Sequence, residues 1–483
     1  MCTSVRWLTL GLAAAVLLIP QRTVAQAPRL ALAPCSIPGV EGEVKCGVHS
    51  VFENRQAGAG RTIPLFVGVL PALESSARDP LFVLAGGPGQ SASSLAGFAN
   101  TAFGDVRRHR DIVLVDLAGT GRSAALQCSM YTTARDLVSD FYPIARVRAC
   151  RDSLARRVDL RRYTTSTLMD DLDDVRAALG YATINIYGTS YGTRAALVYV
   201  RRHRAHVRAV VLKAVAPTTM RGTMDYARDT ERSLGYLFGA CTTDSACVRA
   251  FPNLSTEFGE VLARADRGAL RGLVPDPAGG SPVELPLSRG VVASTLLGLL
   301  QNSNSAVRLP LLVHTTFLGD TRPFVEAIVA YRRALDKSIA FGMHLSVLCS
   351  EDAPRMEPAR ASVADRGTAL GDYRVAQLAA ACNEWVRENV PRGFADPVRS
   401  DVPALLVSGT LDPNTNERWG AEAARYLSRA THVVIPNLSH GFSSIAVCGA
   451  SFIAAFIDNA SADRVDMSCK DHVKLPPFVL PDR

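Results

Sequence analysis

The sequence predicts an α/β protein with a mostly parallel central sheet flanked by helices and with an inserted, mainly helical domain. Short apolar runs without polar alternation recur along the chain of 483 residues, as in strands buried on both faces of a parallel sheet. Segments with helical periodicity separate these runs, which is typical of α/β folds. Between about 218 and 400 this alternation stops, and helical patterns predominate.

The individual elements follow from these patterns in chain order. Apolar runs predict strands at 62–70, 81–85, 112–117, 184–187, 207–211, 404–407 and 432–435. Helical periodicity predicts helices at 169–180, 191–203 and 443–457. We therefore expect a first core part at 26–217, a helical cap insertion at 218–400 and a second core part at 401–483.

The N-terminal segment has the pattern of a signal peptide. Arg6 precedes an apolar stretch of 13 residues at 7–19, and small residues follow at Val24 and Ala25. A hydrocarbon core of ~30 Å needs about 20 apolar residues, so this stretch is too short to cross it. We expect cleavage after Ala25, secreted or periplasmic localisation, and no stable membrane insertion after signal cleavage. The alternative interpretation is an uncleaved anchor.

Ten cysteines remain after residue 25, and their even number in an exported chain indicates disulfides. There is no Cys-x-x-Cys and no neighbouring His pair, so the spacings do not suit zinc. The sequence alone leaves many connectivities open. Because pairing of neighbours closes short loops, our expectation is 35–46, 128–150, 241–247, 349–382 and 448–469.

The distribution of charged residues along the sequence does not indicate a nucleic-acid partner. The formal net charge is +8, but the basic residues are scattered and no Lys/Arg run alternates with aromatic residues. We therefore expect no nucleic-acid binding. His203 and His206 lie among arginines, and we interpret them as part of a solvated helix face. The acidic residues at 170–174 are interpreted as a feature of a helix N-terminus. Neither a metal nor a cofactor is expected.

A nucleophile motif lies between a predicted strand and a predicted helix. Residues 188–192 (GTSYG) follow the strand at 184–187 and precede the helix at 191–203. In this context Gly-x-Ser-x-Gly forms a sharp turn that exposes the serine at a helix N-terminus. Side chains at Gly188 or Gly192 would collide with neighbouring backbone. We expect Ser190 to be a catalytic nucleophile; the alternative is a glycine-rich turn with a capping serine.

A serine nucleophile needs a base and a carboxylate that orients the base. Asp412 lies just past the strand at 404–407, and His440 lies just past the strand at 432–435. This is the chain order of Ser, Asp and His that accompanies such a turn. We expect His440 to accept the Ser190 proton and Asp412 to orient its ring.

The negative charge that develops on a carbonyl oxygen during acyl transfer needs N–H donors. Residues 86–89 (GGPG) follow an early strand, and glycines let backbone N–H groups approach a ligand closely. We expect the Gly87 N–H and the Tyr191 N–H, next to the nucleophile, to form the oxyanion hole.

These motifs together resemble those of a known family. The segments 86–89, 116–123 (DLAGTGRS), 188–193, 411–413 (LDP) and 439–441 (SHG) occur in the order found in α/β-hydrolase serine peptidases. That family includes prolyl aminopeptidase and secreted tripeptidyl aminopeptidases. The resemblance implies an α/β-hydrolase fold and the release of residues from substrate peptides with a free N-terminus. The C-terminal part, with Asp412, His440 and the pair Cys448 and Cys469, looks like the tripeptidyl-aminopeptidase-type C-terminal region.

The chain departs from the family pattern at three places. Ala85 stands where the family usually has His, Ala118 where it has Arg, and Lys213-Ala214 where it has Asp-Gly. None of the three changes a triad residue, but they leave loop packing and substrate preference open.

Acidic cap residues hold the substrate α-ammonium in similar aminopeptidases. Glu351 and Asp352 follow Cys349, and we expect Glu351 to take this role by a charge-assisted hydrogen bond. The alternative is a solvated charged loop. Two other functions stay open: a secreted carboxylic-ester hydrolase with the same triad, and a binding protein that has kept the fold without catalysis.

Overall fold

The computed structural model describes residues 1, 3–4, 29–74, 79–277, 279–441 and 448–481. The expected signal peptide, 1–25, lies outside the described residues except for positions 1, 3 and 4. The start of the expected helix at 443–457 also lies outside them.

A nine-stranded sheet forms the centre of the molecule, with the order β1-β2-β3-β5-β4-β6-β7-β10-β11. The strands from β5 to β11 in this order run parallel to one another, and β1 to β3 are antiparallel. In chain order, strands β1 to β7, β10 and β11 span Ala33–Pro34, Lys45–Phe52, Thr62–Leu70, Leu81–Leu84, Ile112–Val115, Ile184–Thr189, Val207–Lys213, Ala404–Gly409 and Ala430–Ile435. The seven predicted strands are confirmed, while β1 and β2 escaped prediction.

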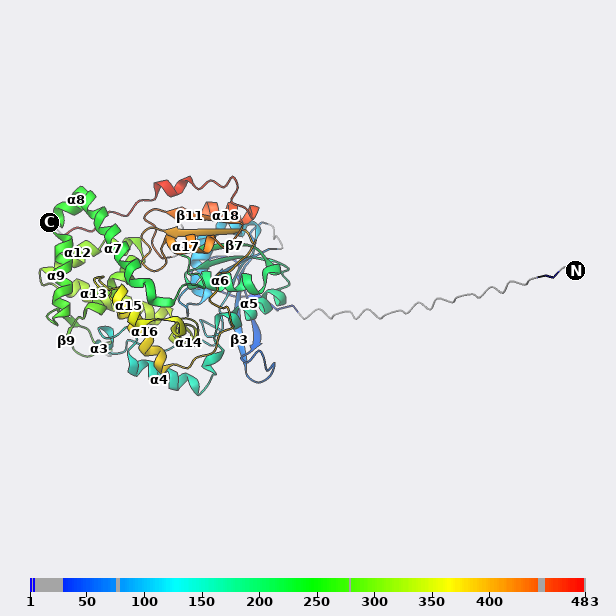
Figure 1. The fold of residues 1–483 in the computed structure, drawn as a ribbon, viewed down its shortest axis with the longest axis horizontal. Coiled ribbons are helices and arrows are strands. Elements are labelled where there is room, and N and C mark those ends of the chain that lie inside the picture. The colour runs from blue at the N-terminus through cyan, green and yellow to red at the C-terminus, as the bar shows by residue number, and fades with distance from the viewer. Residues whose placement is uncertain (2, 5–28, 75–78, 278, 442–447, 482–483) are drawn as a thin grey trace.

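Helices cover both faces of the sheet (Figure 1). Alternate strand residues pack into two separate apolar clusters, because successive side chains point to opposite faces. One face carries α1 (Ala96–Ala102), α2 (Gly104–His109) and α18 (Gly449–Asn459). The other carries α5 (Thr165–Leu179), α6 (Tyr191–Arg202) and α17 (Glu417–Ala424). The three predicted helices are therefore present, with shifted ends.

The segment between β7 and β10, which we call the cap (residues 218–400), is mainly helical (Figure 1). It also contains a small hairpin, β8 (Arg271–Val274) and β9 (Val283–Pro286), that the sequence did not predict. Its helices α7 to α16 are Tyr226–Thr243, Ser245–Ala250, Leu254–Asp266, Arg289–Leu300, Ser303–Ala306, Leu309–Phe317, Arg322–Ser338, Phe341–Glu351, Pro358–Ala364 and Tyr373–Glu384.

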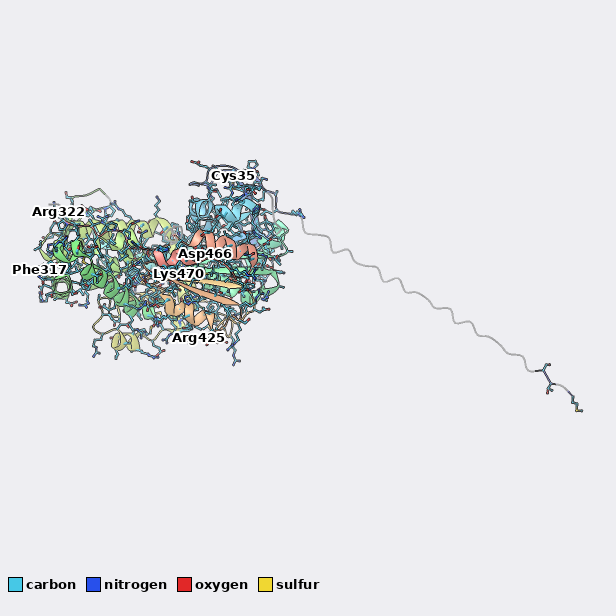
Figure 2. All side chains as sticks on the ribbon, turned by 90° about the horizontal axis from the view of Figure 1, so that it is seen from above. Cys35, Phe317, Arg322, Arg425, Asp466 and Lys470 are labelled. Carbon is cyan, nitrogen blue, oxygen red and sulfur yellow. A yellow bond between two sulfur atoms is a disulfide. The ribbon has the colours of Figure 1, made fainter. Side chains whose placement is uncertain are left out.

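Two helices outside the cap, α3 (Ala134–Leu137) and α4 (Ile144–Ala155), follow β5 and pack against cap helices. Seen from above, Phe317 and Arg322 of the cap lie at the far end from Cys35, which is beside the sheet (Figure 2). Short 3-10 turns complete the described chain at Ala92–Leu95, Leu160–Arg162, Arg204–His206, Gly222–Asp225, Ala353–Arg355 and Ser468–His472.

The last described residues return from α18 to the cap, and the C-terminal end lies beside α8 and α12 (Figure 1). The Val479 N–H donates to the Val307 carbonyl at 3.2 Å, and Phe478 packs on the cluster that contains Phe251 and Leu254. This segment therefore ties the cap to the second core part.

All five expected disulfides are present, so the sequential pairing is confirmed: 35–46, 128–150, 241–247, 349–382 and 448–469. Disulfides persist in oxidising compartments, so the pairing favours an extracytoplasmic protein. Among the described residues, none of the helices combines the length and the apolar character needed to cross a bilayer.

Candidate active site

The turn between β6 and α6 holds Ser190 in a strained conformation. Ser190 has φ 55° and ψ −125°, a region that non-glycine residues rarely adopt. A Cβ on Gly188 would lie 2.4 Å from the Gly192 carbonyl oxygen, and one on Gly192 would lie 2.3 Å from that of Leu84. The two glycines are therefore required for the sharp turn that exposes the serine.

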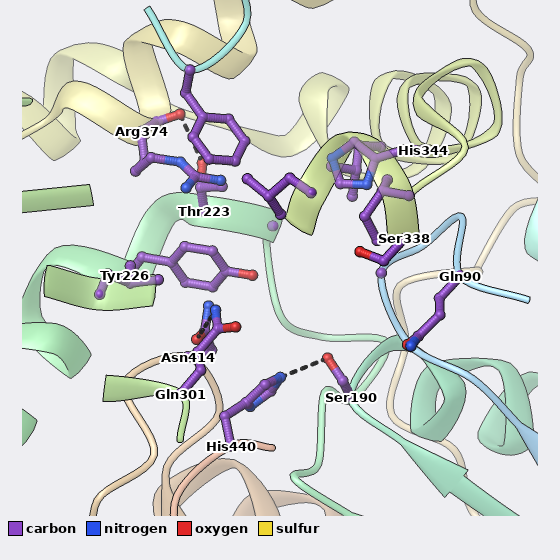
Figure 3. Close-up of a pocket in the computed structure, with 18 of the residues that line it drawn as sticks. Gln90, Ser190, Thr223, Tyr226, Gln301, Ser338, His344, Arg374, Asn414 and His440 are labelled. Atoms are coloured by element: carbon purple, nitrogen blue, oxygen red, sulfur yellow. Dashed lines mark hydrogen bonds between the residues drawn. The ribbon is translucent and has the colours of Figure 1, made fainter. Parts of the chain in front are cut away.

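Three loops at the carboxyl ends of parallel strands bring the predicted triad residues together. The His440 Nε2 lies 3.0 Å from the Ser190 Oγ, and its Nδ1 lies 2.9 and 3.0 Å from the two Asp412 oxygens. Figure 3 shows the His440 ring pointing at Ser190. Because Nδ1 must donate to the carboxylate, Nε2 is the nitrogen that can accept the serine proton.

Asp412 is buried and fully hydrogen-bonded. Its Oδ1 accepts from the Asn414 and Thr415 N–H groups, and its Oδ2 accepts from the Thr415 hydroxyl, each at 2.9 Å. Burial opposes its ionisation, but the His440 ring, the Lys213 charge and the Thr415 N–H together hold the pKa of Asp412 below its usual range. The carboxylate stays charged and fixed beside His440.

Lys213 is a residue of this site whose role the sequence did not reveal. It lies at the end of β7 and is 1% exposed. Its ammonium donates to three successive backbone carbonyls, those of Ser439, His440 and Gly441. Burial lowers the pKa of Lys213 to about 8, against the opposing charge of Asp412. Lys213 thus clamps the loop that carries His440.

The Gly86–Gly89 loop passes close to the serine. A Cβ on Gly86 would lie 3.1 Å from the Ser190 Cβ, and both Gly86 and Gly87 line the cavity above Ser190. Gly87 has φ 107°, which favours glycine. Tyr191 is the first residue of α6, so its N–H belongs to the unsatisfied donors of a helix start.

Helix α14 of the cap holds this glycine loop from above. The Ala340 N–H donates to the Gly89 carbonyl at 3.0 Å, and the His344 Nδ1 donates to the Pro88 carbonyl at 2.9 Å. The His344 Nε2 accepts from the Tyr142 hydroxyl at 2.8 Å. Burial lowers the pKa of His344 to about 4, so its ring is neutral at pH 7 and keeps this arrangement.

A cavity of about 280 Å³ lies between the cap, which forms its roof, and the strand-end loops that carry Ser190, Asp412 and His440, which we call its floor. The cap contributes apolar and aromatic side chains to its wall, and the amides of Gln301 and Asn414 bond to each other at 3.0 Å. Among the described residues that line the cavity there is no carboxylate, and Arg374 is the one arginine or lysine. Figure 3 shows Arg374 on the side of the cavity away from Ser190.

Glu351 occupies a different position from the one expected. Its carboxylate is buried at the end of α14 and accepts from the Thr165 N–H at 2.6 Å and the Thr165 hydroxyl at 2.9 Å. It is not among the residues that line the cavity. Burial raises its pKa to about 7, against the opposing charge of Arg194. Glu351 therefore does not face the cavity as the expected amine anchor. It is not part of a solvated loop either, because it is buried against the start of α5.

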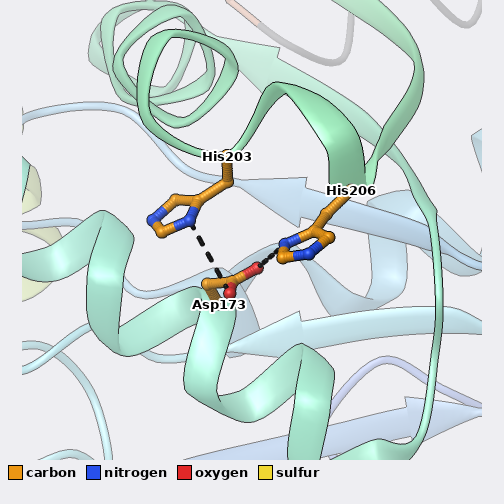
Figure 4. Close-up of side chains that lie close together, drawn as sticks. All are labelled: Asp173, His203 and His206. Carbon is orange, nitrogen blue, oxygen red and sulfur yellow. Dashed lines mark hydrogen bonds and ion pairs between the residues drawn. The ribbon is translucent and has the colours of Figure 1, made fainter.

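A second cluster of ionisable groups joins the middle of α5 to the C-terminal end of α6 and the turn that follows it. His206 Nδ1 lies 2.7 Å from the Asp173 carboxylate, and His203 Nδ1 lies 3.6 Å from it (Figure 4). Asp173 also accepts from the Arg176 Nε at 2.7 Å and from the Tyr199 hydroxyl at 2.7 Å. A cation would have to displace Arg176, so we interpret the cluster as an ion-pair network. Helix α5 begins at Thr165 and has no acidic residue in its first turn, so the interpretation of residues 170–174 as a helix-start feature was wrong.

Sequence comparisons agree with the fold. A family model described as "alpha/beta hydrolase fold" matches residues 79–237, and one described as "TAP-like protein" matches residues 367–469. A tripeptidyl aminopeptidase of Streptomyces coelicolor is 30% identical over 199 residues, which cover 36% of this chain and 35% of that protein. A proline iminopeptidase of Neisseria meningitidis is 29% identical over 137 residues, 28% of this chain and 32% of that protein. The matches thus span about a third of each relative.

Solved structures with similar folds are more distant in sequence. A proline iminopeptidase of Mycobacterium smegmatis is 13% identical with a TM-score of 0.42, covering 86% of this chain and 98% of that chain. An esterase of Thermogutta terrifontis is 13% identical with a TM-score of 0.38 and the same coverages. The sheet topology and the family model at residues 79–237 show that the chain has the α/β-hydrolase fold, and residues 367–469 resemble the TAP-like family.

Proposed function

We propose that this protein is an exported serine hydrolase that releases residues from the N-termini of peptides. Ser190 is the nucleophile, His440 the general base and Asp412 the residue that orients His440. The Gly87 and Tyr191 N–H groups bind the oxyanion. The observation that carries the proposal is the continuous hydrogen-bonded chain from Ser190 Oγ through His440 to Asp412, which opens on the cavity.

The reaction follows from these positions. The Ser190 oxygen attacks the scissile carbonyl carbon while His440 Nε2 takes the serine proton. The carbonyl oxygen becomes negative and receives hydrogen bonds from the two N–H groups. The C–N bond then breaks, His440 returns the proton to the leaving amine, and the acyl group stays on Ser190. Water, activated by His440, releases the acyl group as a carboxylic acid and restores the enzyme.

The exopeptidase specificity rests on two observations. The sequence relatives are named as a tripeptidyl aminopeptidase and a proline iminopeptidase. The cavity of about 280 Å³ is at the small end of ligand pockets, which measure about 300–1,000 Å³, and the cap covers it. A short acyl group fits such a space better than the middle of a long chain. Export is supported by the five disulfides.

A second candidate function is hydrolysis of carboxylic esters by the same residues. One observation favours it: among the described residues, no carboxylate lines the cavity to hold a substrate ammonium. With Glu351 bound to Thr165, the amine anchor that we expected from the sequence is engaged elsewhere.

The test is a substrate panel on purified wild-type protein and on Ser190→Ala. Tripeptidyl, prolyl and aminoacyl amides, each with a free or an acetylated N-terminus, are compared with short-chain esters. We expect Ser190→Ala to lower kcat by about 10⁴- to 10⁶-fold and to abolish labelling by a fluorophosphonate probe. Ser281→Ala, which changes an exposed serine in the β8–β9 loop, is the control.

The two functions give different results in this panel. Faster cleavage of free than of acetylated peptides supports the exopeptidase. Hydrolysis of esters without cleavage of any amide overturns it in favour of the esterase. Unchanged probe labelling of Ser190→Ala would show that Ser190 is not the nucleophile.

A further inference from the structure

Arg374 is a buried cation in the wall of the cavity. It lies on α16, is 6% exposed, and its guanidinium lies above the Tyr226 ring in Figure 3. Its Cζ is 3.4 Å from the centroid of the Phe141 ring and 5.9 Å from that of the Tyr226 ring. These aromatic faces stabilise a positive charge but do not neutralise it.

No protein group within the described residues neutralises Arg374. No carboxylate lies within ion-pair distance of its guanidinium, and its buried Nε has no hydrogen-bond partner. Arg194 and Arg332 also have a buried Nε without a hydrogen-bond partner, but their terminal nitrogens have acceptors in the protein. Arg194 donates to Asp352 at 2.8 Å, and Arg332 donates to the Tyr131 hydroxyl at 2.9 Å.

An uncompensated buried charge costs several kcal/mol, so proteins normally pair such groups. Arg374 reaches the cavity that contains Ser190, and a ligand in that cavity can supply the missing anion. A guanidinium presents a planar fork of N–H donors that matches a carboxylate in a bidentate arrangement. The same charge repels an ammonium group.

We propose that the acyl part of the substrate carries a carboxylate, which Arg374 binds while Ser190 attacks the carbonyl at the other side of the cavity. This inference rests on the proposed hydrolysis at Ser190 and names its substrate class. Two sources of the carboxylate have this chemistry: a glutamyl or aspartyl side chain in the released residues, or a dicarboxylic acyl group such as succinyl or glutaryl. In both, the positive charge of Arg374 selects the anionic substrate over its neutral counterpart.

The test uses matched substrates that differ only in this charge. Peptide amides with Glu are compared with those with Gln at the same position, succinyl with succinamoyl peptides, and a glutaric monoester with the ester of glutaramic acid. For wild-type protein we expect kcat/KM to be about 10- to 150-fold higher for the anionic member of at least one pair. The pair that shows the preference identifies the source of the carboxylate.

Variants separate a specificity role from a structural one. Arg374→Gln should remove the preference and leave kcat/KM of the neutral substrates within about threefold of wild type. Arg374→Lys, which keeps the charge, should retain part of the preference. Arg360→Gln makes the same charge change on an exposed cap residue and should have no effect. Equal losses for anionic and neutral substrates in Arg374→Gln, or equal rates for wild type in every pair, overturn the proposal.

A binding measurement keeps the proposal testable apart from catalysis. Glutarate should raise the melting temperature of wild type and of Arg360→Gln, whereas glutaramide should not. If Arg374→Gln does not fold, the comparison of glutarate with glutaramide on wild type decides the question. If no amide or ester is hydrolysed, the proposed function fails, while stabilisation by glutarate alone would still assign the anion site. Absence of stabilisation by glutarate in that case overturns both.

Discussion

The floor and the roof of the cavity differ in how well their polar groups are satisfied. On the floor, Asp412, His440 and Lys213 form hydrogen bonds with fixed partners from the strand-end loops. On the roof, Arg374 lies between aromatic rings with its Nε unbonded. A reaction centre gains from complete preorganisation, because its groups then need no rearrangement during the reaction. A recognition site can leave one group for the ligand to satisfy.

The largest effect on kcat should come from a substitution in the floor, at Asp412. Asp412→Asn keeps the shape but removes the charge that orients His440 and stabilises its protonated form. We expect kcat to fall by about 10³- to 10⁴-fold with little change in KM. Initial rates on the best substrate of the panel measure this. The exposed Asp105→Asn should behave as wild type; a fall below tenfold for Asp412→Asn would exclude the orienting role.

A smaller effect is expected from the clamp beneath the floor. Lys213→Met removes three donors to the His440 loop, so kcat should fall about 10- to 100-fold while KM changes little. The lowered pKa has a second consequence. Between pH 8 and 10.5 unfolded Lys213 binds a proton that the folded protein has released, so the free energy of unfolding of wild type rises with pH there. Urea unfolding at pH 7.5 and 10 should show this rise in wild type and not in Lys213→Met.

The smallest effect on catalysis should come from Glu351, which lies behind the roof. Glu351→Gln should leave KM for free and acetylated peptides within about twofold of wild type. Folded Glu351, with a pKa raised to about 7, binds a proton between pH 4.5 and 7 that the unfolded chain has lost. The unfolding free energy of wild type should therefore contain a component that falls as pH rises over this window, and the variant should lack it.

Calorimetry at pH 5 and pH 7.5 measures the free energy of unfolding of wild type and of Glu351→Gln. A large increase in KM for Glu351→Gln that is specific to peptides with a free N-terminus would show that Glu351 binds the substrate amine. It would contradict the expectation that Glu351 lies behind the cavity wall without contacting substrate.

Strands and site loops could be predicted where burial leaves a strong pattern. The strands from 81–84 to 404–409 are buried on both faces, so they appear as uninterrupted apolar runs. Ser190 and Asp412 follow such runs, and His440 follows the half-buried edge strand β11, which placed all three at the carboxyl ends of strands. The half-exposed β2 (KCGVHSVF) has no uninterrupted apolar run, and the hairpin β8–β9 is short and largely exposed, so neither gave this signal.

The roles of single charged residues were less accessible to sequence reasoning. Glu351 meets Thr165 across 186 positions of the chain, and Lys213 meets His440 across 227. No local pattern encodes such contacts. Arg374 lies in a helix with several polar residues, where an arginine is usually exposed. Its burial follows from the packing of α16 against α4 and α14, which only the folded chain reveals.

The hydrogen bonds from α14 to the Gly86–Gly89 loop couple binding under the cap to stabilisation of the oxyanion. Because Ala340 and His344 hold the carbonyls of Gly89 and Pro88, a displacement of α14 also displaces the Gly87 N–H. Coupling between two such positions is reciprocal in free energy. A compound that wedges under the roof would therefore act as a mixed inhibitor, lowering kcat as well as affinity. Conversely, a transition-state analogue bound to Ser190 should slow hydrogen exchange of the α14 amides.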